Sequence, residues 1–303
     1  MAPKSAPRAG TPAEAPRSHA LGTVAAIFYI FLWASAYVPS KIGVLASSPL
    51  WFLVVRFATA GTLALVLALA LGARAPRSLR TWGILLALGV LNNAVYLGCT
   101  YEALRHLATG IGAIIASMNP LILALVAPAL LREPLTRTKV AGLALGFAGV
   151  IGIMLARLGT GTANPGDVAL AVTGVLGSVA ATVLFKRFVI SVDLRITTGV
   201  QLLGAGAVLL PLALIFEGAP HATWSPAFIV SFAYLVVIIS VGASTLWFWL
   251  LTQGEASRVS AFYFLTPIFG LFLGASLLHE PVGVRDLFGL AAIALGIFLV
   301  QRA

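Results

Sequence analysis

Long runs of apolar residues fill the chain from residue 21 to its end, and short charged or turn-forming segments separate them. A helix needs roughly 20 residues to cross the hydrocarbon core of a bilayer, and each run has about that length. The pattern therefore predicts an all-α integral membrane protein with ten transmembrane helices. The predicted spans are Leu21–Ser40, Trp51–Gly72, Trp82–Tyr101, Thr109–Leu131, Val140–Leu158, Asp167–Phe185, Thr197–Phe216, Ala227–Leu250, Val259–Leu278 and Val284–Gln301.

The composition supports this interpretation and excludes other classes of protein. Of the 303 residues, 60% are hydrophobic and 9% are charged, whereas a soluble domain carries about 45–50% apolar and about 25% charged residues. One soluble core cannot bury so many apolar side chains, so most of them must face lipid. A soluble enzyme, a nucleic-acid-binding module and a secreted disulfide scaffold are excluded, and Cys99, the single cysteine, cannot form an internal disulfide.

The distribution of basic residues predicts how the chain is oriented. The net charge is +10, and with the N-terminus inside, 14 of the 19 Lys and Arg residues fall in cytoplasmic segments and four in outer segments. Because basic residues concentrate in the short cytoplasmic loops of membrane proteins, both termini are predicted to be cytoplasmic. Residues 1–19 contain four prolines and several basic residues, which predicts a disordered basic cytoplasmic tail.

The chain contains an internal duplication. Its second half matches its first at an offset of 147 residues, which becomes 145 near the start of each half. The repeats are two five-helix units, residues 20–158 and residues 166–301. Five is an odd number, so the second unit enters the membrane from the opposite side, and inverted repeats of this kind are typical of transporters. Equivalent residues are Pro120 and Pro267, Glu133-Pro134 and Glu280-Pro281, Gly149 and Gly296, Lys41 and Lys186, and Ala60-Gly61 and Ala205-Gly206.

Several of these residues also resemble the EamA-type repeat of the drug/metabolite transporter superfamily. Within it, the chain looks most like the ten-helix amino-acid exporters of the YddG type. The resemblance implies a bacterial inner membrane, two cytoplasmic termini and a central cavity lined chiefly by the first, third, fourth, sixth, eighth and ninth spans. The residues that carry it are Trp33-Ala34-Ser35-Ala36-Tyr37 before Lys41, Arg56, Pro120 with Glu133-Pro134-Leu135, and Pro267 with Glu280-Pro281-Val282.

Charged side chains are nearly absent from the predicted spans. Every Asp and Glu lies near a span end, in a loop or in the tail, and Arg56, near the outer end of the second span, is the one basic residue inside a span. Proton-coupled carriers usually place an ionisable group deep in the membrane. The resemblance implies that multidrug members of the superfamily use a glutamate in their first helix, and the predicted first span, Leu21–Ser40, contains no glutamate. The substrate is therefore predicted to be neutral overall or zwitterionic, and transport to proceed without a membrane-embedded proton-coupling carboxylate.

Polar residues within the spans cluster on the third and the eighth. The 147-residue offset relates Asn93 to Ser240, so the two clusters are equivalent in the duplication. Their amide and hydroxyl groups could bind an ammonium and a carboxylate, and their aromatic rings could form flat walls with cation–π capacity. The alternative is that they only bond or pack helix to helix. The candidate substrate-binding residues are Asn92, Asn93, Tyr96, Ser240, Ser244 and Trp247, together with Trp33, Tyr37 and Tyr263.

Two further repeated features have a functional and a structural interpretation. Pro120 and Pro267 lie mid-span at equivalent places, and proline removes a backbone hydrogen bond and permits bending. We interpret them as hinges, the alternative being static kinks. Glu133-Pro134 and Glu280-Pro281 end one helix and begin the next, a structural role in which nearby arginines would pair with the glutamates.

The chain is thus predicted to be a transporter that exports neutral or aromatic amino acids by alternating access. It should act as a monomer in the bilayer on a small-molecule substrate, with no cofactor, metal ion or nucleic acid. Export of other small metabolites or drugs is the first alternative. An intramembrane serine protease, suggested by Gly242-Ala243-Ser244-Thr245 and His279, is the second, and Ser244→Ala should abolish a protease but only modulate a carrier.

Overall fold

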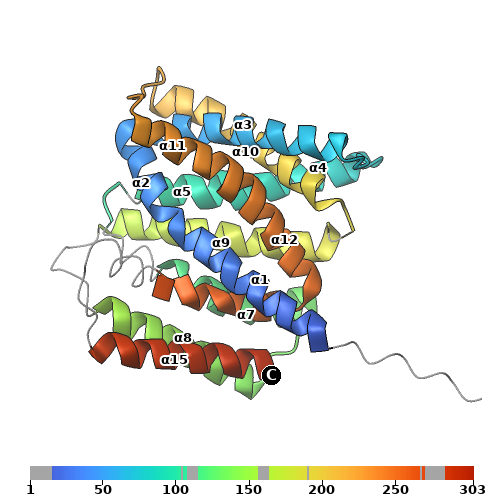
Figure 1. The fold of residues 1–303 in the computed structure, drawn as a ribbon, viewed down its shortest axis with the longest axis vertical. Coiled ribbons are helices and arrows are strands. Elements are labelled where there is room, and N and C mark those ends of the chain that lie inside the picture. The colour runs from blue at the N-terminus through green and yellow to red at the C-terminus, as the bar shows by residue number, and fades with distance from the viewer. Residues whose placement is uncertain are drawn as a thin grey trace, which may run out of the picture.

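The computed structural model describes residues 16–103, 105–107, 115–155, 164–189, 191–266, 268–269 and 284–303, which fold into a bundle of helices (Figure 1). These residues contain no β-strand, and one isolated bridge joins Ser47 to Ala222. In the first half the helices are α1 (Pro16–Ser35), α2 (Tyr37–Ala46), α3 (Pro49–Ala70), α4 (Leu79–Gly89), α5 (Tyr96–Ala103), α7 (Asn119–Leu131) and α8 (Arg137–Leu155).

The second half contains α9 (Pro165–Phe188), α10 (Leu194–Phe216), α11 (Pro226–Tyr234), α12 (Ser244–Gln253), α13 (Ala256–Ala261) and α15 (Val284–Arg302). Two π-helical segments interrupt long helices. The first, η1 (Val90–Val95), joins α4 to α5, and the second, η2 (Leu235–Ala243), joins α11 to α12. A short 3-10 turn, η3 (Phe262–Leu265), follows α13.

Six helical stretches among the described residues are long and apolar enough to cross a membrane. They agree with predicted spans to within a few residues at most ends, because the length of an apolar run is set by the thickness of the bilayer. The stretches are Leu21–Ala46, Pro49–Ala70, Leu79–Ala103, Pro165–Phe188, Leu194–Phe216 and Pro226–Gln253.

Helix starts follow from local sequence. α3, α9 and α11 each begin with proline, whose missing N–H is not needed in the first turn. The Asn164 side chain accepts a hydrogen bond from the Gly166 amide at 2.9 Å, and the Ser225 hydroxyl accepts one from the Phe228 amide at 3.1 Å. These caps satisfy amide groups that the helices themselves leave without partners.

The first helix differs from its prediction at both ends. α1 begins at Pro16, so residues 16–19, predicted to belong to a disordered tail, are helical. The helix then breaks after Ser35 and continues as α2 beyond the predicted end at Ser40. Pro39 explains the break, because it has no N–H to donate to the Ser35 carbonyl. The Ser35 hydroxyl also donates to the Leu32 carbonyl at 2.7 Å.

Equivalent helices of the two halves pack in pairs. α3 lies along α10, and α8 lies along α15 (Figure 1). α8 and α15 approach so closely that a Cβ atom added at Gly142 would lie 2.7 Å from the Gly296 carbonyl oxygen, and one added at Gly149 would lie 2.8 Å from that of Gly289. Any larger side chain would separate the two backbones, and small residues at such contacts are characteristic of packed membrane helices.

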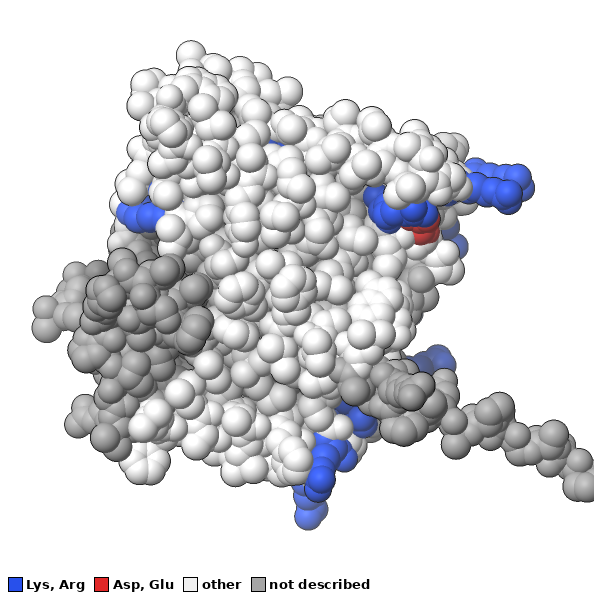
Figure 2. All heavy atoms as spheres, viewed as in Figure 1, with Lys and Arg blue, Asp and Glu red and all other residues white. Residues whose placement is uncertain are grey.

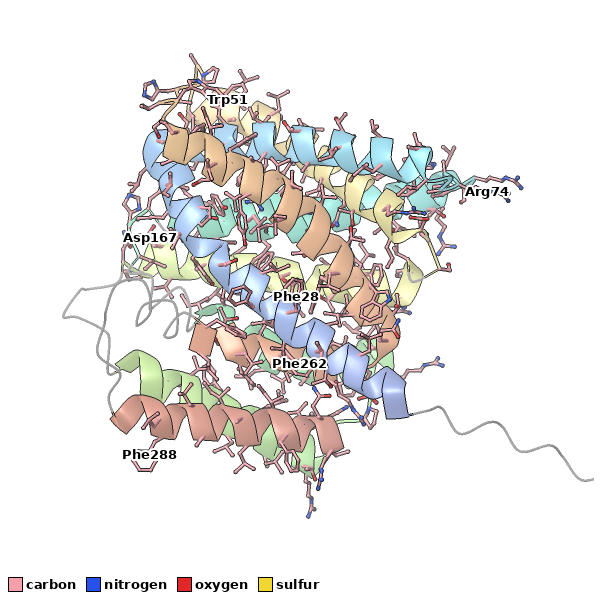
Figure 3. The ribbon with its side chains drawn as sticks, in the orientation of Figure 1. Phe28, Trp51, Arg74, Asp167, Phe262 and Phe288 are labelled. Carbon is pink, nitrogen blue, oxygen red and sulfur yellow. The ribbon has the colours of Figure 1, made fainter. Side chains whose placement is uncertain are left out.

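The outer surface is apolar over a broad band. On the face in Figure 2, Lys and Arg side chains lie near the periphery and the centre is uncharged. Arg74 and Asp167 lie near opposite ends of the bundle (Figure 3). Large apolar side chains such as Leu125 and Phe216 are 72% and 75% exposed. Such a surface suits lipid tails, which need no polar partner.

Candidate functional site

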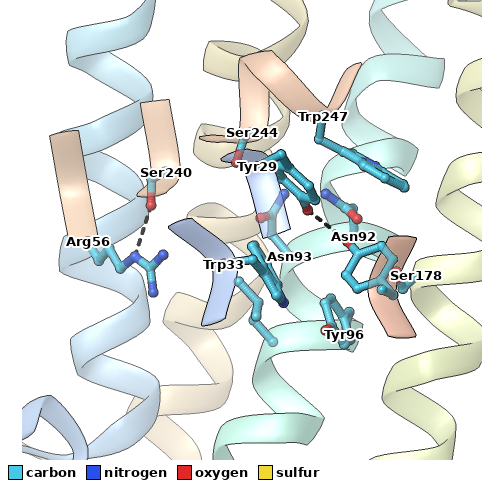
Figure 4. A pocket seen from close by; sticks show the side chains of 12 residues that line it. Tyr29, Trp33, Arg56, Asn92, Asn93, Tyr96, Ser178, Ser240, Ser244 and Trp247 are labelled. Carbon is cyan, nitrogen blue, oxygen red and sulfur yellow. Dashed lines mark hydrogen bonds between the residues drawn. The ribbon is translucent and has the colours of Figure 1, made fainter. Parts of the chain in front are cut away.

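Most of the predicted binding residues line a single cavity between the two halves of the chain. Its volume in this conformation is about 20 Å³, which is room for about one water molecule. Figure 4 shows its aromatic rings and amide groups converging from several helices. Of the nine predicted binding residues, the cavity is lined by Trp33, Asn92, Asn93, Tyr96, Ser240, Ser244, Trp247 and Tyr263.

The two π-helical segments position the polar groups. Asn92 and Asn93 belong to η1, Ser240 belongs to η2, and Ser244 follows η2 directly. Hydrogen bonds from residue i to i+5 widen the turn, and such segments are frequent at functional sites. Both neighbours Asn92 and Asn93 therefore reach the same cavity.

One side of the cavity is a continuous aromatic wall. The Tyr29 ring stacks on Trp247 with centroids 5.2 Å apart and on Trp33 at 6.0 Å. Trp33 in turn stacks on Tyr96 at 6.2 Å. The hydroxyls of Tyr29 and Tyr263 lie 2.7 Å apart in a hydrogen bond. Flat apolar faces with a hydroxyl at one end suit a ligand that is partly aromatic or cationic.

The lining also carries amide groups that join η1 to α10. The buried Gln201 side-chain oxygen accepts hydrogen bonds from the Asn93 amide at 3.2 Å and the Asn92 amide at 3.4 Å. On α9, Ser178 lines the cavity and accepts a hydrogen bond from the Asn119 side chain at 3.1 Å. These contacts combine the two interpretations of the polar residues, since the same groups bond between helices and face the cavity.

The remaining predicted residues lie elsewhere. Tyr37 lines a second cavity, and Tyr96 lines both, so Tyr96 stands between the two spaces.

Pro120 is in the first turn of α7, just after a two-residue turn at Ser117 and Met118, so the fourth span is interrupted before the proline. Pro267 lies outside the described residues.

Sequence reasoning missed several residues of this cavity. Tyr29, Leu97 and Ser178 also line it. A single tyrosine or serine in an apolar helix carries no pattern that separates it from packing residues. Arg56 lines the cavity as well and is 3% exposed. Its position near one end of α3 suggested a peripheral residue, but the neighbouring helices enclose it completely.

Of the serine and histidine suggested for a serine protease, Ser244 lies within the described residues. The Ser244 hydroxyl donates to the Ile239 carbonyl of its own helix at 3.4 Å. His279 lies outside the described residues. Within the described part of the chain, no three His, Cys, Asp or Glu side chains are close enough together to hold a metal ion.

Glu133 has different partners from the arginines that the sequence suggested. Its carboxylate accepts hydrogen bonds from the backbone amides of Ala256 at 2.7 Å and Ser257 at 3.0 Å, and from the Ser257 hydroxyl at 2.6 Å. These residues begin α13, which has no cap of its own. Glu133 therefore joins the first half of the chain to the second, a long-range contact that local sequence does not reveal.

Further polar contacts lie at the same end, one between the halves and the others within one half or the other. Buried Lys139 pairs with Glu255 and donates to the Pro134 carbonyl at 3.0 Å. Lys186 donates to the carbonyls of Leu251 and Gly254 at 3.0 and 2.7 Å. We name Glu133, Lys139, Lys186 and Glu255 the end cluster. It ties α12 and α13 to α7, α8 and α9.

Comparisons with known proteins match the chain twice to one family. The family is described as the EamA-like transporter family, and the matches cover residues 20–155 and 166–302. The uncharacterized transporter YvbV of Bacillus subtilis (strain 168) is 30% identical over 274 residues, covering 90% of this chain and 89% of that protein. Protein PecM of Dickeya dadantii (strain 3937) is 26% identical over 272 residues, covering 89% of each chain. One solved crystal structure matches the fold with a TM-score of 0.77 at 20% identity, covering 95% of this chain and 98% of that chain.

Proposed function

Because this chain belongs to the EamA-like transporter family and is a multi-pass membrane protein, we propose that it exports neutral or aromatic amino acids by alternating access. The observation that carries the proposal is the cavity between the halves, which is lined by an aromatic wall and by amide and hydroxyl groups. An amino-acid ammonium group would lie against the ring faces, which attract cations. An apolar side chain would pack on the same rings, and the amide groups would orient its polar end.

We propose ten helices in two inverted five-helix repeats, residues 20–158 and 166–301. The close contacts of α8 with α15 support this arrangement: the 147-residue offset relates Gly142 to Gly289 and Gly149 to Gly296, so it converts one close glycine pair into the other. The segments η1 and η2 likewise occur at equivalent places in the two halves. Alternating access would then exchange the conformations of the two repeats.

The proposed orientation places both termini in the cytoplasm of a bacterial inner membrane, so the end cluster lies at the cytoplasmic end. Its carboxylate–amide bonds and its ion pair hold the start of α13 and the preceding Glu255 to the α7–α8 loop and to Lys139 of α8. We therefore assign this conformation to a state closed toward the cytoplasm. The interruption before Pro120 supports a bend in the fourth span during the cycle. A monomer is the proposed unit, since one chain supplies the whole cavity.

Transport should not require a proton gradient. Within the described residues, every Asp and Glu side chain lies at a helix end or in a loop. A carrier driven by protons usually places an ionisable group deep in the membrane. Export down the amino-acid gradient is therefore the proposed mode.

The test is uptake into proteoliposomes across a panel of labelled amino acids, with and without a pH gradient. We expect saturable uptake of aromatic amino acids that persists without the gradient. Trp247→Ala, which removes part of the aromatic wall, should weaken uptake strongly, whereas Trp224→Ala, at a 70% exposed tryptophan, should not. An absolute need for the gradient would refute the uncoupled mode, and no uptake of any amino acid in the panel would favour an exporter of other metabolites or drugs.

A further inference from the structure

Arg56 is a buried cation at the edge of the cavity. It is the eighth residue of α3, and its side chain is directed into the cavity (Figure 4). The Nε atom donates to the Ser240 hydroxyl at 2.9 Å, and Nη1 donates to the Tyr101 hydroxyl at 2.9 Å. The Tyr101 hydroxyl also lies 2.6 Å from that of Ser40. Two hydroxyl groups thus hold the guanidinium, and Ser40 in turn holds the Tyr101 hydroxyl.

This cation has no carboxylate partner among the described residues. A guanidinium has five N–H donors, and the two protein bonds use one from Nε and one from Nη1. One N–H of Nη1 and both of Nη2 remain as donors, and guanidinium donors of this kind bind carboxylates by charge-assisted hydrogen bonds. Burying a charge without a counter-ion is unfavourable, so a cation held in this way needs a functional reason.

The duplication supplies an internal comparison for the charge. The 145-residue offset that relates Ala60-Gly61 to Ala205-Gly206 relates Arg56 to Gln201. Both side chains connect to the polar helix of the other half: Arg56 to Ser240, and Gln201 to Asn93. A neutral amide is therefore sufficient to join these helices. The positive charge at Arg56 is not explained by that structural role.

We propose that Arg56 is the binding site for the carboxylate of the transported substrate, with Ser240 and Tyr101 holding the guanidinium in place. The substrate class is then a small organic carboxylate whose apolar body rests on the aromatic wall, which includes zwitterionic amino acids and excludes their amides and amines. This inference deepens the proposed function and rests on it only for the identity of the cavity.

The test measures the affinity of the purified full-length protein in detergent for three probes that differ at one group. These are L-phenylalanine, L-phenylalaninamide and 3-phenylpropionate, followed by ligand-induced thermal stabilisation. The wild-type protein should bind both carboxylates about tenfold or more tightly than the amide, the size expected for a charge-assisted hydrogen bond. Arg56→Gln, which introduces the residue of the other repeat, should bind all three within about threefold.

Matched variants separate carboxylate binding from helix packing. Arg74→Gln removes an exposed arginine and should keep the wild-type preference for carboxylates. Tyr101→Phe removes one bond to Arg56 but leaves the charge, so it should lower the melting temperature and still prefer carboxylates. Arg56→Lys keeps the charge without the fork, so its preference should be weaker than that of the wild type but present, and this variant decides the question if Arg56→Gln does not fold.

The outcomes distinguish this inference from the proposed function. If the wild-type protein does not prefer the carboxylates, or if both Arg56 variants retain the full preference, the carboxylate site is refuted. If phenylalanine is transported and bound without dependence on Arg56, the amino-acid exporter stands and the carboxylate site fails. If 3-phenylpropionate binds in an Arg56-dependent manner and phenylalanine does not bind, the carboxylate site stands and the amino-acid proposal fails.

Discussion

Replacing Glu133 by glutamine should destabilise the protein far more than its place in a loop between α7 and α8 suggests. The carboxylate is 7% exposed and accepts three hydrogen bonds from Ala256 and Ser257 at the start of α13. Both of its oxygens are acceptors, one facing the Ala256 amide and the other facing Ser257. A glutamine side chain keeps one acceptor and presents an NH₂ group where the other oxygen was, so a donor would face a donor.

The magnitude follows from these three bonds. A hydrogen bond to a charged group contributes about 1.5–3 kcal/mol, and a neutral bond about 1 kcal/mol. Losing one charged bond and converting the others to neutral bonds should therefore lower the free energy of unfolding by about 3 kcal/mol. For a chain of this length, 1 kcal/mol corresponds to roughly 2 °C in melting temperature, so the expected fall is about 6 °C.

The assay is thermal unfolding of the purified protein in detergent, followed by tryptophan fluorescence. The control is Glu102→Gln, because Glu102 forms an exposed pair with Arg105 at 2.8 Å, and pairs of this kind contribute about 0–1 kcal/mol. Ser257→Ala removes only the hydroxyl bond and should give a smaller fall than Glu133→Gln. Equal melting temperatures for Glu133→Gln and Glu102→Gln would refute the claim that Glu133 holds the two halves together.

Three further predictions concern the cavity, the bend and pH. In a Cys99→Ala background, a cysteine at Tyr96 should react with a small polar thiol reagent and be protected by substrate, whereas one at lipid-facing Leu125 should not be protected. Pro120→Ala should lower the maximal transport rate and leave the apparent affinity within about threefold. The reason is that alanine restores a backbone donor next to the interruption and leaves the cavity intact. Transport at the parental rate would contradict a hinge. The side-chain hydrogen bond from Arg195 lowers the pKa of Asp193. The ionised carboxylate therefore stabilises the fold above the usual aspartate pKa, and this stabilisation is lost as the pH falls through the lowered value. The melting-temperature difference between the wild-type protein and Asp193→Asn should accordingly shrink below about pH 4.

The spans could be predicted because a bilayer imposes a length and an apolar composition on every helix that crosses it. The predicted end at Phe216 agrees with α10, and the predicted start at Trp51 is two residues from that of α3. The break after Ser35 was missed because hydropathy does not register the loss of one backbone bond. The π-helical segments were missed for a related reason, since their i to i+5 bonding leaves the apolar run unchanged.

The candidate site was predictable as far as its residues contrast with their surroundings. Asn92 and Asn93 stand out because an amide in an apolar helix needs a partner. The partners themselves were not predictable: Gln201 and the segment that Glu133 caps lie more than 100 residues away, and only folding brings them together. The burial of Arg56 was not predictable from its position along one helix, because burial depends on the helices packed around it.

The duplication separates what the architecture requires from what the function requires. Where equivalent residues have been kept alike, as at Gly142 and Gly289, the same close helix contact recurs, and packing alone accounts for the identity. Where equivalent residues differ although their contacts correspond, packing cannot account for the difference. Arg56 and Gln201 are such a pair, and the difference between them is one positive charge at the cavity edge. A substrate that meets the two repeats with two different ends would require that asymmetry, because a symmetric cavity would bind a carboxylate equally well in either direction.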